Sequence, residues 1–352
     1  MSTVTAQQAV SAAVLDLKPG ELVRVRSASE IFATLDEHGA YDGLPFMPEM
    51  IKYCGRTMPV VQRSDTTCAG TGVVRRMYNT VHLKRVRCDG SAHDGCQAGC
   101  LMFWKEAWLE RVENGAKPVP EPPTTEDEAY VAETLVPAVR KPADTEGAEP
   151  LWRCQATEIP NATEPMRFRE VDQYVRGLEN WKWPKIARGI VFQLFNYWQS
   201  FSQRRLPPAL RIKGGNPYPF IVGKLEKGTT PVIKLDVQPG DLVRIKDKDA
   251  IVATLDTTGR NRGLTFDAEM AMYCGRTARV QARVNHLIEE RTGEMVDIKS
   301  DCIILEGVVC VSDYHRFCTR AIYTYWREAW LEKVEDANAP VNAPCANRWS
   351  RV

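Results

Sequence analysis

The chain lacks several features that would assign it to a familiar class of protein. No uninterrupted apolar run reaches the length that a lipid bilayer demands, so we expect no transmembrane segment. Residues 1–8 carry neither a positive region nor a long apolar stretch, so we expect no secretory signal. The net charge of +1 provides no basic excess for binding a phosphate backbone, which predicts no nucleic-acid partner.

Sequence motifs of the common enzyme classes are also missing. The sequence contains no Walker A motif, no G-x-G-x-x-G opening a helix, no H-E-x-x-H and no G-x-S-x-G. It does contain eleven cysteines, an odd number. In a reducing compartment such a set more often binds metal or reacts than forms disulfides. We therefore expect a cytoplasmic protein whose cysteines bind metal.

One stretch of sequence occurs twice. The first copy opens with Pro19-Gly-Glu-Leu-Val-Arg-Val-Arg26, and the second opens with Pro239-Gly-Asp-Leu-Val-Arg-Ile-Lys246. The offset between the copies is constant over their first halves, and it is two residues larger from Cys88 and Cys310 onward. A Pro-Gly turn followed by alternating apolar and polar residues indicates a short strand. Units of about a hundred residues made of short strands suit small SH3-like barrels.

The predicted fold class is therefore mainly β with a helical middle, containing two duplicated small SH3-like β-barrel domains. The predicted segments are a flexible N-terminus at 1–16, a first metal-binding β-repeat at 17–113, an acidic Pro-rich linker at 114–150, a helical middle at 151–232, a second metal-binding β-repeat at 233–335 and a disordered tail at 336–352.

The two segments between the copies differ in composition. Residues 114–150 are rich in proline and acidic residues and hold too little apolar surface to order themselves. Residues 166–178 predict one helix, and Trp183-Pro184 begins a second that ends at Pro207. Apolar residues at helical spacing make the second helix either a buried brace between the barrels or a membrane-surface contact through 183–205. Its polar face lacks a Lys/Arg stripe, which favours the buried brace.

Cysteine and histidine recur at matching positions in the two copies. A structural zinc site takes four ligands in a tetrahedron, usually Cys with or without His, and its binding energy also stabilises the fold. The shared positions predict one Cys₃His site per copy and two zinc ions per chain. The predicted ligands are Cys54, Cys88, His93 and Cys96 in the first copy and Cys274, Cys310, His315 and Cys318 in the second.

Other interpretations of the cysteines remain open. The thiols could be small hydrophobic residues of a core. The second copy also allows an all-cysteine set in which Cys302 joins Cys274, Cys310 and Cys318. The first copy has two surplus thiols, Cys68 and Cys100, as alternate ligands. Iron or an iron–sulfur cluster is an alternative to zinc, although no C-x2-C-x2-C run occurs.

A catalytic metal typically keeps three protein ligands and a water molecule. In that case the first copy would carry the chemistry, with Asp89, His93 and Cys100 as candidate catalytic residues. Glu106 and Glu328 lie between paired tryptophans in both copies. Either could be a general base, but a glutamate repeated in both copies is more often a structural hydrogen-bond acceptor.

The segments Gly43–Met50, Arg87–Cys100 and Phe103–Trp108 resemble a family of uncharacterised bacterial proteins, as do Trp152–Thr157 and Gly214–Phe220. The resemblance covers most of the chain. It implies a setting near polysaccharide or natural-product biosynthesis genes and carries no activity or catalytic residue.

We therefore expect a metal-binding tandem-repeat protein that acts as a binding or scaffold module for a protein or carrier partner. The alternative is a metalloenzyme of natural-product or polysaccharide biosynthesis, with its active site in the loop from Cys88 to Cys100.

Overall fold

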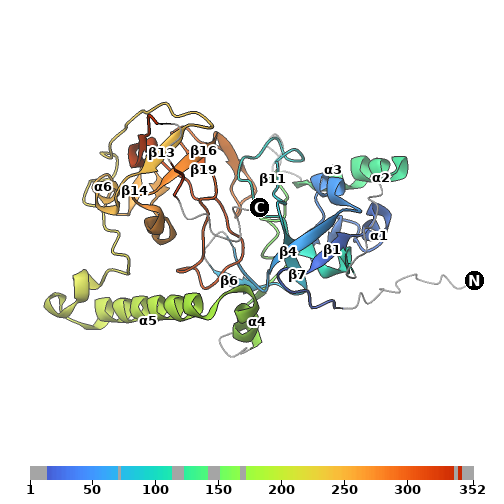
Figure 1. Cartoon of the computed structure of the whole chain (residues 1–352), viewed down its shortest axis with the longest axis horizontal. Coiled ribbons are helices and arrows are strands. Elements are labelled where there is room, and N and C mark those ends of the chain that lie inside the picture. The colour runs from blue at the N-terminus through green and yellow to red at the C-terminus, as the bar shows by residue number, and fades with distance from the viewer. Residues whose placement is uncertain are drawn as a thin grey trace, which may run out of the picture. The chain divides into compact units, whose positions relative to one another are not determined.

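The computed structural model describes residues 14–69, 73–112, 123–141, 151–166, 172–336 and 340–342, which form two compact units (Figure 1). The first unit comprises the chain up to Gly95, Met102–Asn180 and Glu289–Glu294, and the second comprises Cys96–Leu101, Trp181–Ile288 and the chain from Met295 onward. None of the helices in these ranges combines the length and the apolar character needed to cross a lipid bilayer.

A five-stranded antiparallel sheet forms the centre of the first unit, in the order β8-β7-β4-β1-β9. Its strands are β1 (Leu22–Val25), β4 (Thr57–Arg63), β7 (Thr80–Leu83), β8 (Trp104–Lys105) and β9 (Leu109–Arg111). Smaller sheets pair β2 (Ala40–Tyr41) with β3 (Leu44–Pro45), β10 (Arg140–Lys141) with β11 (Leu151–Trp152), and β6 (Val74–Arg76) with both β5 (Thr66–Cys68) and β12 (Glu164–Pro165).

The helices of the first unit are short, and local sequence signals explain their ends. They are α1 (Ala28–Phe32), the 3-10 helices η1 (Pro48–Tyr53) and η2 (Glu106–Trp108), α2 (Thr125–Tyr130), the π-helix η3 (Val131–Leu135), α3 (Val136–Ala138) and α4 (Asp172–Asn180). Ser27 caps α1 through a reciprocal pair of hydrogen bonds with Glu30. Pro48 occupies the first turn of η1, where its missing amide hydrogen costs nothing.

The second unit is built around a four-stranded antiparallel sheet in the order β19-β16-β13-β20. Its strands are β13 (Leu242–Ile245), β16 (Thr277–Arg283), β19 (Ile303–Leu305) and β20 (Leu331–Lys333), with the pairs β14 (Arg260–Asn261)–β15 (Leu264–Thr265) and β17 (His286–Ile288)–β18 (Met295–Asp297) beside it in the sequence. Its helices are α5 (Trp183–Arg205), η4 (Pro208–Leu210), η5 (Ile212–Gly215), α6 (Lys248–Val252), η6 (Ala268–Tyr273) and η7 (Glu328–Trp330).

Four strands of the first central sheet, β7-β4-β1-β9, have the same order and register as β19-β16-β13-β20 of the second. Leu22 pairs with Pro59 in the first unit, and Leu242 pairs with Arg279 in the second. The register between β4 and β7 shifts after Val60, and the register between β16 and β19 shifts after Val280. Each of these positions differs from its counterpart by the 220 residues that separate the sequence copies. The repeated sequence therefore adopts the same local structure in both units.

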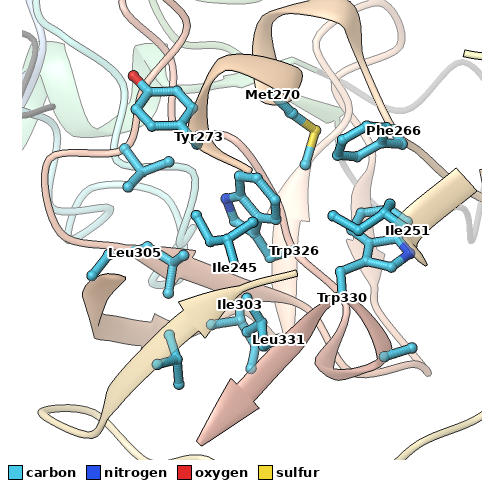
Figure 2. Close-up of a cluster of buried hydrophobic side chains, with 14 of the residues drawn as sticks. Ile245, Ile251, Phe266, Met270, Tyr273, Ile303, Leu305, Trp326, Trp330 and Leu331 are labelled. Atoms are coloured by element: carbon cyan, nitrogen blue, oxygen red, sulfur yellow. The ribbon is translucent and has the colours of Figure 1, made fainter. Parts of the chain in front are cut away.

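The core of the second unit lies on one side of its sheet and is rich in aromatic residues (Figure 2). Trp326 and Trp330 are both fully buried, with their rings 6.4 Å apart and nearly perpendicular. Phe266 packs edge-on against Trp330 at 5.4 Å. In the first unit, Phe46 packs against Trp108 in the same way at 5.3 Å. The repeated Trp-x3-Trp segments are therefore core elements of both units.

The architecture only loosely matches the expected mainly-β fold. Helices and strands occur in similar amounts, and several small antiparallel sheets replace a single large one. Over the ranges described, neither central sheet closes into a barrel, because β8 and β9 remain edges of one and β19 and β20 edges of the other. The SH3-like classification therefore stays a prediction.

Two expectations for the connecting segments also need revision. Part of the predicted 114–150 linker is folded, since α2, η3 and α3 occupy it. Thr124 caps α2 through Asp127, and Leu135 is buried against the rest of the unit. Within the predicted helical middle, β11 and β12 belong to the sheets of the first unit. The predicted flexible N-terminus at 1–16 and disordered tail at 336–352 fall mostly outside the described residues.

A short hairpin tip completes the first unit. Residues 289–294 belong to this unit, and the amide of Trp152 donates a hydrogen bond to the carbonyl of Gly293 at 2.7 Å. Gly293 has a φ of +83°, and a Cβ at this position would lie 2.6 Å from the Trp152 carbonyl oxygen. Only glycine fits this close approach.

Candidate metal centre

Two groups of potential metal ligands occur in the described part of the chain, one in each unit. The first contains Glu49, Cys88 and His93, and the second contains Glu269, Cys310 and His315. Within each group, one ligand atom from every residue lies within 4.8 Å of the others. The structure thus brings together two of the four predicted ligands in each copy and adds a glutamate that the sequence interpretation had missed.

The first group joins a 3-10 helix to a glycine-rich loop. Glu49 is in η1, and Cys88 and His93 follow β7. Gly90 (φ +76°) and Gly95 (φ +69°) turn the loop back on itself, and the carbonyl of Gly90 accepts hydrogen bonds from the amides of both His93 and Gly95. This tight loop holds the imidazole beside the thiol.

The contacts within the first group are close. Cys88 Sγ donates to Glu49 Oε1 at 3.3 Å and lies 3.4 Å from His93 Nε2. The amide of Gly90 donates to the same sulfur at 3.4 Å. Glu49 and His93 are buried, whereas Cys88 is half-buried. Oxygen, sulfur and nitrogen donors therefore meet in one largely enclosed place.

Burial disfavours the charged forms of Glu49 and His93 in the first group. Desolvation raises the pKa of Glu49 and lowers the pKa of His93. Glu49 Oε2 and His93 Nδ1 are buried and find no hydrogen-bond partner among the described residues. An unpaired buried carboxylate oxygen is costly unless a cation or a proton neutralises it. A divalent cation bound by the three side chains would meet that need.

The second group repeats the arrangement with different details. Cys310 Sγ lies 3.4 Å from His315 Nδ1, and Glu269 Oε1 accepts a hydrogen bond from the Tyr314 amide at 2.6 Å. Burial raises the pKa of both Glu269 and Cys310. Glu269 Oε2 is again buried without a partner in the described structure. A buried glutamate oxygen without a hydrogen-bond partner therefore occurs in the described part of both units.

The histidines face their cysteines with different ring nitrogens. His93 turns Nε2 toward Cys88, whereas His315 turns Nδ1 toward Cys310 and places Nε2 3.5 Å from Asp267 Oδ2. The hydrogen bond to Asp267, followed by that to Cys310, raises the pKa of His315 to about 11. Met47 occupies the position that corresponds to Asp267 in the first copy. Among the described residues, therefore, only the second group has a carboxylate that orients its histidine, as outer-shell carboxylates do in metal sites.

We expect Asp267→Asn to weaken metal binding in the second unit by about 10- to 100-fold, because loss of an outer-shell carboxylate typically has this effect. The measurement is a competition titration with a chromophoric chelator in a Cys88→Ser background, which isolates the second group. Asp241→Asn is the matched control, since Asp241 is a carboxylate of the same unit that pairs with Lys333. Equal affinities of the two variants would remove Asp267 from the site.

Cys54 and Cys274, predicted as ligands, are not in the two groups. Cys54 is buried at the end of η1, and burial raises its pKa to about 12. Cys274 packs against the core cluster of the second unit, and burial raises its pKa to about 11. Both therefore match the alternative in which repeated cysteines are small hydrophobic residues.

The remaining predicted cysteines lie outside both groups as well. Cys96 belongs to the second unit, where its sulfur accepts a hydrogen bond from the Ile288 amide at 3.4 Å. The Cys318 amide donates a hydrogen bond to the His315 carbonyl at 3.1 Å, so the backbone of Cys318 contacts that of a residue in the second group. The alternates are Cys68 in β5, Cys100 in the second unit and Cys302, which is buried with a pKa raised to about 12. Neither the Cys₃His sets nor the all-cysteine set is assembled in the residues described.

Asp89, a candidate catalytic residue, contacts Lys52 and Ser91 and is not part of the Glu49 group. It forms an ion pair with Lys52 and accepts hydrogen bonds from the amide and hydroxyl of Ser91. Although partial burial raises its pKa, these hydrogen bonds outweigh burial and lower the pKa to about 2. So strongly ionised a carboxylate is a poor general base near neutral pH.

Glu106 and Glu328 act as structural hydrogen-bond acceptors. Glu106 accepts from the amides of residues 15, 16 and 17 and from Arg63, and Glu328 accepts from the amides of residues 235, 236 and 237 and from Arg283. Each glutamate thereby fastens the segment that leads into the first strand of its unit. This pattern agrees with the structural role that their repetition favoured.

Cys154 is buried, and its amide donates to the Thr157 hydroxyl, whereas Cys345 lies outside the described residues.

Comparisons of the whole chain with protein-family models, curated proteins and solved structures found no match.

Proposed function

We propose that this chain is a metal-binding protein that holds one zinc ion in each unit through a glutamate, a cysteine and a histidine. One observation carries the proposal: the same three residue types meet at corresponding positions of both sequence copies. In each group one carboxylate oxygen is buried and unpaired within the described structure. Two copies that keep the same costly arrangement point to a shared ligand.

The donor set favours zinc over other metals. Magnesium and calcium prefer sites made of oxygen atoms alone, whereas zinc is bound by mixtures of sulfur, nitrogen and carboxylate oxygen. An iron–sulfur cluster is held mainly by several cysteine thiolates, and each group contributes one. The expected iron–sulfur alternative therefore loses support.

In this proposal the two units are copies of one metal-binding unit, and the chain serves as a binding or scaffold module for a protein or carrier partner. The resemblance described above suggests a bacterial biosynthetic pathway as its setting.

A second candidate is a metalloenzyme, because three protein ligands leave a zinc ion with a fourth position for water or substrate. The exposed fractions favour the second unit for such a role. The His315 side chain is 39% exposed, whereas His93 is only 2% exposed. This reverses the expectation that the first copy would carry the chemistry.

One experiment tests the proposal and separates the two roles. Elemental analysis of the purified chain should find two zinc ions per chain, one for each group. Replacing zinc with cobalt and adding azide should leave the visible spectrum unchanged for a scaffold site whose fourth position is shielded from solvent. Azide should shift the spectrum where it reaches an accessible fourth position. A chain that binds neither zinc nor cobalt would overturn the proposal.

A further inference from the structure

Helix α5 lies at the outside of the second unit (Figure 1) and carries an exposed apolar stripe. At 3.6 residues per turn the members of this stripe share an arc of about 120°. They include Trp183, Val191, Leu194, Tyr197, Trp198 and Phe201, all of them exposed. Leu194 is 65% exposed and Tyr197 is 77% exposed, whereas Gln199 on the opposite face is fully buried. This is the reverse of an ordinary surface helix, which turns its apolar side toward the core.

Contacts within the second unit fix the helix in this orientation. Lys185 Nζ donates to the carbonyl of Val311 at 2.6 Å, and Arg188 forms an ion pair with Asp313. Phe192 stacks on Tyr314 with ring centres 5.0 Å apart and planes 2° from parallel. These contacts all lie on the side away from the exposed stripe.

Two further contacts hold the same face. A Cβ at Gly189 would lie 2.7 Å from Phe317 Cζ, so the helix backbone approaches this ring closely. Farther along, Gln199 Nε2 donates to the carbonyls of Ile212 and Asn216 at 3.0 and 2.8 Å. Turning the stripe inward would break all of these interactions. Of the apolar residues of this helix only Ile186 is buried in the described structure, which is fewer than a helix buried along its length would show.

The charge around the stripe identifies what could cover it. Between Trp181 and Leu225 the sequence has eight lysine and arginine residues and no aspartate or glutamate, although the whole chain has a net charge of only +1. Exposed cations lie at both ends of the stripe, with Lys182 before it and Arg204 and Arg205 after it. If the α5 helix of a second copy docked on this stripe, parallel or antiparallel, the cations at the ends of one helix would face cations of the other. An anionic surface meets no such repulsion.

We propose that α5 binds the surface of an anionic lipid membrane, lying in the plane of the interface. Aromatic and aliphatic side chains would enter the boundary between headgroups and acyl chains, and the flanking cations would contact the anionic headgroups. This site is separate from the metal groups, and it stands independently of the proposed function.

Cosedimentation of the full chain with vesicles tests the proposal. The chain should bind phosphatidylcholine vesicles that contain phosphatidylserine, and added salt should weaken the binding because it screens the headgroup charge. The double variant Leu194→Glu/Tyr197→Glu should bind at least ~10-fold more weakly, since each change places a carboxylate where an apolar side chain would insert. Val136→Glu, at an exposed apolar position of the first unit, is the control and should bind normally.

Two results would overturn the proposal. The first is the absence of vesicle binding by the unaltered chain at low salt. The second is a dimer in sedimentation velocity that Leu194→Glu/Tyr197→Glu converts to a monomer, which would show that a second copy covers the stripe. Circular dichroism of the double variant establishes that α5 is still folded, which the exposure of both positions leads us to expect.

Discussion

Replacing Cys88 with serine should reduce the metal content from two ions per chain to one. Cys88 contributes the only sulfur of its group, and its Sγ lies 3.3–3.4 Å from Glu49 Oε1 and His93 Nε2. A serine hydroxyl is a much poorer zinc ligand than a thiolate, so only two effective ligands would remain. Cys310→Ser should remove the other ion, and the double variant should bind none. Elemental analysis after dialysis measures the content.

Cys54→Ser is the matched control for this series. Cys54 is another buried cysteine of the first unit, but it lies outside the Glu49 group. This variant should keep both ions, whereas a Cys₃His site that included Cys54 would lose one. Retention of both ions by Cys88→Ser would exclude Cys88 as a ligand. Native mass spectrometry with hydrogen exchange separates a lost ion from a unit that has failed to fold.

Replacing Glu106 with alanine should destabilise the first unit by about 1.5–3 kcal/mol, the usual contribution of hydrogen bonds to a charged group. Glu106 is 2% exposed, and its partner Arg63 is fully buried but keeps its ion pair with Asp65. The change also leaves the amides of residues 15, 16 and 17 without their acceptor. Hydrogen exchange of amides in β1 and β4 measures the effect in the first unit alone.

Two controls make this prediction specific. Glu328→Ala removes the corresponding carboxylate in the second unit, but its partner Arg283 is 30% exposed and can be solvated. Its cost should therefore be smaller. Glu110→Ala breaks a partly exposed pair with Arg24 and should cost no more than about 1 kcal/mol. Equal effects of Glu106→Ala and Glu110→Ala on the free energy of unfolding would show that burial of the Glu106–Arg63 pair adds nothing to stability.

Local signals in the sequence predicted the elements that local interactions define. The Pro-Gly turns precede β1 and β13 as expected, and Gly20 and Gly240 adopt φ values of +97° and +92°. The bounds of α5 follow from Pro184 in its first turn and Pro207 beyond its end. Periodicity showed which residues of α5 share a face. It could not show which face is buried, because that depends on partners distant in the sequence.

The candidate site was predicted in part. Repetition in register identified Cys88, His93 and their counterparts, because cysteine and histidine are rare enough for a repeated pair to stand out. Glutamate is common, so the repetition of Glu49 by Glu269 at the same offset is not distinctive in the sequence. The role of Glu49 depends on burial beside Cys88, which no spacing reveals. Repetition equally cannot separate a metal ligand from a packed thiol such as Cys54.

The hairpin tip at 289–294 has a consequence for how the protein is made. The first unit includes this segment, whose Gly293 carbonyl accepts the Trp152 amide. A ribosome synthesises a chain from its N-terminus, and domains usually fold in that order as they emerge. Here the earlier unit is complete only after residue 294 has left the ribosome, when most of the later unit has also been translated. A nascent chain arrested before this residue should expose Trp152 to chaperones and proteases.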